Sequence, residues 1–428
     1  MDDLWVVLPH FGAGGAQKVG LLAAEHFAAQ GLKVSVLSLR HGHPIKHALP
    51  DGVRAFDLGP DLLHPWLADV HNRSLPACGR RFLLAQVLRL QRAGVCLLFA
   101  LCWPWIARRM RPELQGLVTR FMASAMPWIG GSRFVRLRQE MLEQRPKRVL
   151  ALLTKTNILC CAALWDQPVH LVVSERNDPR RQKLDRLWSC LRRLYYRRAD
   201  VVTANTEGVL EALQAMGSWQ RLDLLPNPLP GGLHLQESAG SGQGELQVAS
   251  RELEVLAVAR LVPQKGLDLL IRAFASLPEP VRAGWRLVLV GDGPKRSALK
   301  ALVHQKGIGD HVAFEGFQAD PLRYMQQASI FALPSRFEGM PNALLEAMAS
   351  GLPSVVSDAS PGPLEMVCDG RQGLVVPNEN VDAFAVALER LMVDECLRLR
   401  LGAAAQDTLR ALDWDVVEPH WRSVLALP

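Results

Sequence analysis

The sequence has few of the features that mark metal-binding, secreted or membrane-spanning proteins. Its 8 cysteines include no Cys-x-x-Cys pair and form no cysteine and histidine cluster at the spacing of a zinc site, so we expect a reducing cytosol and no structural metal. The longest run without a charged residue, 93–107, is shorter than the roughly 20 residues that a helix needs to cross a bilayer core. The N-terminus, Met1-Asp2-Asp3-Leu4, lacks the basic start of a signal peptide. We therefore expect the Asn72-Arg73-Ser74 sequon to be unused.

Length and composition predict a chain of two or three domains. It has 428 residues, 49% hydrophobic and 21% charged, which excludes a single small binding module. The net charge of +7 is modest, but it is unevenly distributed. Residues 1–228 carry 31 basic and 18 acidic side chains, whereas residues 229–428 carry 18 and 24. The two halves are therefore expected to face different partners.

Short apolar blocks alternate with helical patterns through both halves. Nearly continuous apolar runs are typical of parallel strands buried on both faces, and the alternation indicates crossover helices. We therefore predict an α/β fold of two tandem, doubly wound, Rossmann-like parallel-sheet domains. The blocks that predict strands are 4–8, 34–39, 169–173, 201–202, 255–259, 287–290, 330–333 and 354–356.

A change of composition places the domain boundary. Pro226-Asn227-Pro228 leads into a Ser-, Gly- and Gln-rich stretch at 237–250, in which no helix or strand is expected to continue. We therefore predict an N-terminal domain at 1–228, a linker at 229–252 and a C-terminal domain at 253–412. Residues 413–428 predict an amphipathic helix that begins at Asp413 or Asp415. One expected arrangement is that this helix packs back on the N-terminal domain.

One stretch of the first half, 79–148, departs from the alternation. It holds 14 basic and 3 acidic side chains with aromatic residues between them, and such helices bind the headgroup region of anionic membranes. The run 94–103 has no polar face, which an ordinary surface helix would show. We therefore expect a peripheral protein on the inner face of the cytoplasmic membrane; a solvated basic hairpin over ordinary core is the alternative. No nucleic-acid-binding signature accompanies the charge, so no nucleic-acid partner is expected.

A glycine-rich loop follows the first predicted strand. Gly14 and Gly15 precede a predicted helix, so free backbone amides and the positive helix end are offered to an anion or a sugar hydroxyl. A dinucleotide fingerprint would need a third glycine at Gln17 and an acid at Arg40, which disfavours a dehydrogenase. A structural turn without a ligand is the other interpretation.

Two cations stand on a predicted strand-to-helix loop in the second half. Arg260 and Lys265 lie five residues apart after the block 255–259. A planar guanidinium and a point charge at this spacing can hold a diphosphate between them. Gly291, at the end of the next predicted strand, offers the flexibility needed for a ligand to approach. Two solvated surface cations are the alternative.

The segment 334–351 is the most specific signal. A predicted strand ends in a loop that bears Glu338, Pro341 starts a helix, and Glu346 lies within two turns of that start. The helix start suits a phosphate, and carboxylates at its edge suit sugar hydroxyls. A purely structural role would not explain two carboxylates beside an apolar helix face.

These residues together resemble a nucleotide-sugar-dependent glycosyltransferase of the GT-B fold, in the retaining glycosyltransferase group 1 family that includes bacterial surface-polysaccharide enzymes. Arg260 and Lys265 match the family's diphosphate pair, and Glu338 with Glu346 matches its motif of two glutamates separated by seven residues. The first half contributes weaker matches, at 14–19, 174–179, 205–208 and 226–228.

The resemblance implies roles for individual residues. Arg260, Lys265 and Glu338 would be catalytic, with Glu338 on the donor sugar and Glu346 on the ribose, while Phe317 would border the base. Glu175 and Arg176 would lie on the acceptor side. The remaining donor-binding positions would be Gly14, Gly15, Gly291, Gly339, Met340, Pro341, Asn342, Ala343 and Leu344.

The resemblance also implies the reaction and its partners. We expect transfer from a UDP-sugar to a glycan or polyprenyl-diphosphate-linked acceptor with retention of configuration, and no metal or other cofactor. Asp413-Trp414-Asp415 has the form of a metal-binding Asp-x-Asp, but its place before a terminal helix favours an N-cap. A nucleotide-sugar epimerase of similar fold and a non-catalytic membrane scaffold are the alternative functions.

Overall fold

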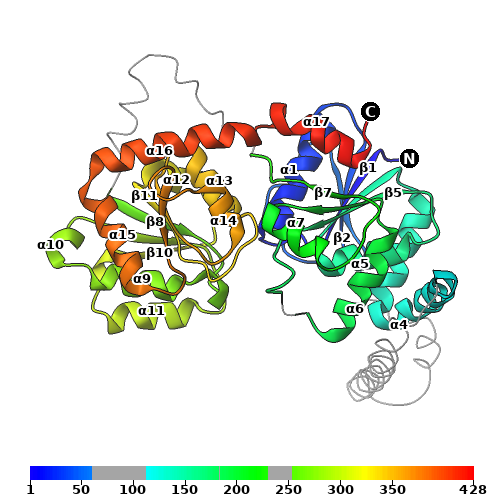
Figure 1. The fold of residues 1–428 in the computed structure, drawn as a ribbon, viewed down its shortest axis with the longest axis horizontal. Helices are drawn as coiled ribbons and strands as arrows, with labels where there is room; N and C mark the ends of the chain where they lie inside the picture. The colour runs from blue at the N-terminus through cyan, green and yellow to red at the C-terminus, as the bar shows by residue number, and fades with distance from the viewer. Residues whose placement is uncertain (60–111, 183, 230–252) are drawn as a thin grey trace.

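A computed structural model describes residues 1–59, 112–182, 184–229 and 253–428. Two α/β units lie side by side in Figure 1, and α16 and α17 run along the top of both. Most of the predicted linker and residues 60–111, which include half of the predicted membrane-facing segment, lie outside the described residues.

The N-terminal unit is built on a seven-stranded parallel sheet with the order β3-β2-β1-β4-β5-β6-β7. Its strands are β1 (Leu4–Leu8), β2 (Val34–Ser38), β3 (Arg54–Asp57), β4 (Arg148–Leu152), β5 (His170–Glu175), β6 (Val201–Ala204) and β7 (Leu222–Leu224). Its helices are α1 (Gly15–Ala29), α4 (Pro112–Gln144), α5 (Thr154–Ala163), α6 (Arg186–Tyr195) and α7 (Glu207–Gln214).

The C-terminal unit is built on a six-stranded parallel sheet with the order β10-β9-β8-β11-β12-β13. Its strands are β8 (Glu254–Val258), β9 (Arg286–Val290), β10 (Val312–Gly316), β11 (Ile330–Leu333), β12 (Ser354–Ser357) and β13 (Gly373–Val376). The helices are α9 (Leu267–Ser276), α10 (Glu279–Arg282), α11 (Arg296–Gln305), α12 (Leu322–Gln327), α13 (Asn342–Ala349), α14 (Pro361–Met366), α15 (Val381–Val393), α16 (Glu395–Leu409) and α17 (Trp414–Leu425). Two tandem doubly wound domains, the predicted fold class, are thus confirmed.

Each sheet is covered on both faces, which explains the unbroken apolar runs of its central strands. In β1, Leu4, Val6 and Leu8 pack into one core cluster, whereas Trp5 and Val7 pack into another on the opposite face. Because successive side chains of a strand point to opposite faces, every position must be apolar when helices cover both.

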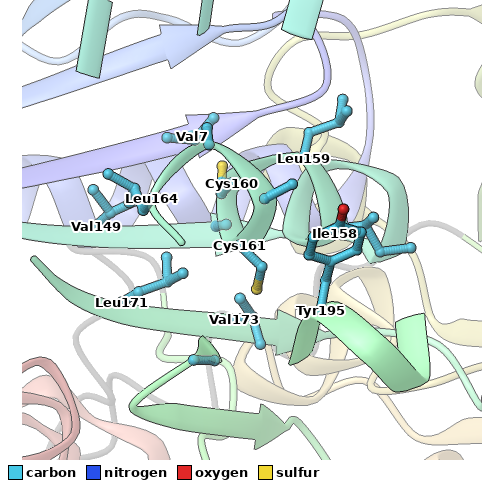
Figure 2. Packing of buried hydrophobic residues seen from close by; sticks show 14 of the residues in the cluster. Val7, Val149, Ile158, Leu159, Cys160, Cys161, Leu164, Leu171, Val173 and Tyr195 are labelled. Carbon is cyan, nitrogen blue, oxygen red and sulfur yellow. The ribbon is translucent and has the colours of Figure 1, made fainter. Parts of the chain in front are cut away.

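Cys160 and Cys161 on α5 are apolar core residues. Both are fully buried and free of disulfides, and Figure 2 shows them among Val7, Val173 and the surrounding strand side chains. Burial raises the pKa of both thiols. The pair therefore contributes to packing as small hydrophobic side chains rather than as a reactive or metal-binding pair.

The described end of the predicted membrane-facing segment is partly core. Helix α4 kinks at Gly131, where φ is 65°, and beyond the kink Phe134, Leu137 and Met141 are buried in the N-terminal core. This part of the segment follows the alternative of ordinary core packing. No helix among the described residues is both long and apolar enough to cross a membrane.

The C-terminal helix α17 belongs to the core of the N-terminal unit. Val417, Trp421 and Val424 join the cluster formed by β1 and α1, and α17 contacts β4 and β5. The chain therefore passes between the units twice, and the backbone N–H of Leu229 donates to Leu412 O at 3.1 Å where the two crossings meet.

The packing of α17 predicts a large stability effect at one residue. Replacing Trp421, which is fully buried, by alanine is expected to lower the free energy of unfolding by roughly 3–5 kcal/mol because it opens a cavity in the core. Val416→Ala on the same helix is the control, since Val416 is 59% exposed and should change little. Urea unfolding of both variants measures this, and equal midpoints would contradict it.

Candidate active site

A large cleft lies between the two sheets, at the carboxyl ends of their strands. It has a volume of about 580 Å³ and is lined by both units. Loops after β1, β8, β9, β10 and β11 all contribute residues. Ligands of open α/β sheets bind at this edge, because the strand ends and helix starts meet there.

The two predicted cations stand on the C-terminal wall of the cleft. Arg260 is exposed and lies two residues after the end of β8, while Lys265 ends a short 3₁₀ turn and its side chain is 17% exposed. The turn closes through Gly266, whose φ is 62° and where a Cβ atom would lie 1.9 Å from Pro334 O. The glycine thus lets the cation-bearing loop pack against the loop after β11.

Glu338 is held on that neighbouring loop. Its Oε1 lies 2.5 Å from Lys265 Nζ and accepts from the Ser335 hydroxyl at 2.6 Å. Its backbone N–H donates to Ser360 Oγ at 2.8 Å. The side chain is 6% exposed, so the ion pair with Lys265 provides the charge that a buried carboxylate requires.

The start of α13 opens onto the same cleft. Gly339, Met340, Asn342 and Ala343 line it, and first-turn amides have no partner within the helix. Pro341 also lines the cleft but has no N–H to donate. Leu344, the last residue of the predicted series, does not line the cleft. Its N–H donates to Pro341 O at 3.0 Å, and its side chain is fully buried in the core. It points away because two residues along an α-helix turn a side chain by roughly 200°, which places Leu344 on the opposite side of α13 from Asn342.

Glu346 faces the cleft one turn further along α13. Its side chain is 7% exposed, and its Oε1 lies 2.7 Å from Nζ of Lys18, a residue of α1 in the opposite unit. Burial raises the pKa of the carboxyl, and the charge and hydrogen bond of Lys18 oppose that rise. The two glutamates of the motif are therefore each paired with a lysine, one from each unit.

The glycine-rich loop forms the opposite wall. Gly14 and Gly15 line the cleft, and Gly15 O accepts from Asn342 Nδ2 at 3.0 Å. His10, at the end of β1, also lines it and stacks on His43 with ring centroids 4.4 Å apart. Burial, together with the neighbouring His43, lowers the pKa of His10, so the neutral imidazole is favoured.

Phe317 and Gly291 also line the cleft. Phe317 lines it beyond β10, and Lys46 of the N-terminal unit lies over its ring with Nζ 4.9 Å from the centroid. At Gly291 φ is 138°, and a Cβ atom would come within 1.9 Å of Ala259 O. Glycine is required there so that the loops after β8 and β9 can lie together.

The structure separates the two residues predicted for the acceptor side. Arg176 lines the cleft and is 6% exposed; its Nη1 donates to Asn227 Oδ1 at 2.5 Å, and burial lowers the pKa of its guanidinium to about 9. Glu175 is fully buried inside the N-terminal unit and is not part of the lining. Its carboxylate accepts from Tyr196 at 2.5 Å and Thr154 at 2.8 Å, so it points away from the cleft, because neighbouring strand residues face opposite sides.

Several contacts hold the two units together across the cleft. Asn227 Nδ2 donates to Met340 O at 3.2 Å and to Asn342 Oδ1. Gly339 lies so close to the N-terminal unit that a Cβ atom there would be 2.3 Å from Arg176 O. The cleft in this arrangement is closed over the helix start of α13.

Sequence reasoning did not assign roles to Lys18, His10 or Asn227. Lys18 and Asn227 lie within quoted segments, at 14–19 and 226–228, but their partners are 328 and 115 residues away. A local pattern carries no signal for a contact of that kind. Only the fold brings them to the cleft.

Among the described residues, no group of three or more histidine, cysteine, aspartate or glutamate side chains could hold a metal ion. Asp413 and Asp415 flank the first residue of α17 and are not part of the cleft lining. The Asp-x-Asp interpretation therefore has no counterpart at the candidate site.

Comparison with known proteins finds a family match in the C-terminal part of the chain and similar proteins of known name. Residues 243–408 match the family described as "Glycosyl transferases group 1". The chain is 32% identical over 228 residues to the lipopolysaccharide core biosynthesis glycosyltransferase LpsE of Rhizobium meliloti, covering 53% of this chain and 64% of LpsE. It is 30% identical over 221 residues to an N-acetylgalactosaminyltransferase of Campylobacter jejuni that acts on a diphospho-undecaprenol-linked sugar by its name, covering 51% and 58%.

The chain spans less than two thirds of the length of these two curated relatives. It is also 36% identical over 227 residues to an exopolysaccharide phosphotransferase of Streptomyces coelicolor, and this match covers only 22% of that protein. Solved structures match the whole chain. Anabaena HepE, solved with UDP-glucose, has a TM-score of 0.70 at 18% identity with 100% of both chains covered, and the sucrose-phosphate synthase of Thermosynechococcus elongatus has 0.69. Residues 243–408 are thus a domain of the glycosyl transferases group 1 family, carried on a chain with the two-domain GT-B fold.

Proposed function

We propose that the protein is a glycosyltransferase of bacterial polysaccharide or glycolipid synthesis. It would move a hexosyl group from a nucleotide-diphosphate sugar to a glycan or lipid-linked glycan, with retention of configuration. The observation that carries the proposal is the convergence of two cations, two buried carboxylates and a helix start on one cleft between the units. The two cations and the helix start complement a diphosphate, and the two carboxylates complement the hydroxyls of a sugar and of a ribose.

The cations would act on the leaving group. Departure of a nucleoside diphosphate leaves negative charge on the β-phosphate, and Arg260, Lys265 and the first amides of α13 would stabilise it. Glu338, beside Lys265, would accept hydrogen bonds from the donor sugar. In same-face transfer a diphosphate oxygen takes the proton of the incoming hydroxyl, so the protein would supply no general base.

We further propose a UDP-sugar as the donor. HepE, which matches the full chain, has been solved with UDP-glucose. The base would lie beside Phe317, and the ribose beside Glu346. No metal is included in the proposed site, and transfer is expected to continue in EDTA.

The acceptor would enter from the N-terminal side. The name of the Campylobacter jejuni relative specifies a diphospho-undecaprenol carrier, and a polyprenyl-diphosphate-linked glycan is the acceptor we propose here. The basic segment 79–148, apart from its end beyond Gly131 that packs in the core, would hold the enzyme on the anionic inner face of the cytoplasmic membrane. Sedimentation with anionic vesicles at low salt tests this part by itself.

The deciding experiment is an assay of a panel of nucleotide sugars with native membranes, with the anomeric configuration of the product read by NMR. We expect one donor to be consumed only when acceptor is present, with the α or β configuration preserved. Conversion of the donor alone would instead indicate an epimerase. Absence of nucleotide binding with retained vesicle binding would indicate a scaffold.

A further inference from the structure

Lys18 reaches across the cleft from one unit to the other. It lies in the first turn of α1, directly after the glycine-rich loop, and its Nζ is 2.7 Å from Oε1 of Glu346 on α13. The two side chains are 24% and 7% exposed. Solvent and salt screen such a shielded pair much less than a surface pair.

We infer that Lys18 is a positioning residue for nucleotide binding, which holds the Glu346 carboxylate charged and oriented for the ribose hydroxyls of the donor. The inference rests on the proposed function, in which Glu346 binds the ribose. It adds a residue of the N-terminal unit to a subsite otherwise formed by the C-terminal domain.

The geometry leaves room for the ligand on the same carboxylate. Lys18 donates a hydrogen bond to Oε1 of Glu346, and within the described part of the chain no group donates to Oε2 of that carboxylate. A charged carboxylate only accepts hydrogen bonds, whereas a ribose diol donates two. Protonation would turn one oxygen into a donor and remove the match to the diol.

The electrostatic surroundings make Glu346 dependent on Lys18. Burial raises the pKa of Glu346, and Asp320 near α12 raises it further, while Lys18 lowers it by charge and by hydrogen bonding. On its other side Lys18 faces His47, whose pKa is lowered by burial and by the Lys18 charge. Without Lys18 the carboxyl would therefore keep its proton to a higher pH.

The consequence is that the ribose subsite is complete only when the two units are closed. Glu346 comes from α13 and its counter-ion from α1, on opposite walls of the cleft. Nucleotide binding and domain closure are thereby coupled, because an open cleft would separate the pair and leave a buried carboxylate without its cation.

The test is calorimetric binding of UDP and of 2′,3′-dideoxy-UDP to the full chain between pH 5.5 and 8.5. Lys18→Met is expected to weaken UDP binding by roughly tenfold at the lower pH values, with affinity recovering as the pH rises. The nucleotide's own titration is common to both proteins and cancels in the ratio of their affinities. The dideoxy analogue lacks the hydroxyls and should bind both proteins equally.

Matched variants separate positioning from general damage. Lys18→Arg should restore most of the affinity, and Lys33→Met, an exposed lysine just beyond α1, should behave as the unmodified protein. In a Glu346→Gln background, Lys18→Met should have little further effect. Equal UDP affinity of the Lys18→Met and unmodified proteins at every pH would overturn the inference alone, whereas failure of the unmodified protein to bind UDP, GDP, ADP or CDP would overturn the proposed function with it.

Discussion

Replacing Lys265 by alanine is expected to reduce sugar transfer by roughly 100- to 1,000-fold, the range seen when one preorganised donor to a developing charge is removed. Lys265 is 17% exposed and lies 2.5 Å from Glu338 in the candidate donor cleft. Its loss would leave the departing diphosphate less neutralised. It would also leave the buried Glu338 carboxylate with Ser335 but without a cation.

Initial rates with the donor identified by the panel measure this effect. Lys265→Arg should recover part of the rate because it keeps the charge, although its planar fork differs from an ammonium. Lys306→Ala is the matched control, since Lys306 is an exposed lysine of the same unit outside the cleft. If Lys265→Ala kept a rate within threefold of the unmodified enzyme, with an unchanged melting temperature, the assignment of the diphosphate site would be wrong.

Gly339→Ala is expected to lower transfer by about 100-fold without unfolding either unit, because a displacement of about 1 Å at a reacting centre costs about that much. A Cβ atom at this position would lie 2.3 Å from Arg176 O of the opposite unit. That distance is far below van der Waals contact and the obstacle is backbone, so the units could not close over α13 as they do here.

The loss should appear in kcat and also in nucleotide affinity, because the added methyl group would keep the units apart and so separate Lys18 from Glu346. Small-angle scattering should show a larger radius for the variant in the presence of UDP. Gly309→Ala is the control, since no atom lies within 4 Å of a Cβ atom there. A fully active Gly339→Ala enzyme would show that the closed cleft is not the arrangement used in transfer.

Central strands other than β4 could be predicted because helices cover both faces of each sheet. The blocks predicted at 4–8 and 330–333 coincide with β1 and β11, since burial on both sides demands apolar residues at every position. The edge strands β3 and β7 carry a weaker signal. In β3, Arg54–Asp57, the side chains are exposed or half-buried, because an edge strand has a neighbour on one side only, and two of its four residues are charged.

The C-terminal wall of the cleft was predictable for a similar reason: its residues are local in the sequence. Arg260 and Lys265 share one loop, and Glu338 and Glu346 lie on one loop and the helix that follows. Strand-to-helix geometry then places them at one edge of the sheet. The prediction went too far at Leu344, where the helical turn directs the residue into the core.

Periodicity and spacing over a few residues were enough to predict the two-domain parallel-sheet architecture and the residues on the C-terminal wall of the cleft. Which residues of the first half face the cleft follows only from the way the chain folds. Arg176 lines it and the adjacent Glu175 does not, and Lys18 pairs with a carboxylate 328 residues away. Contacts between distant segments depend on how the two units close on each other, and no local pattern of residues encodes that arrangement.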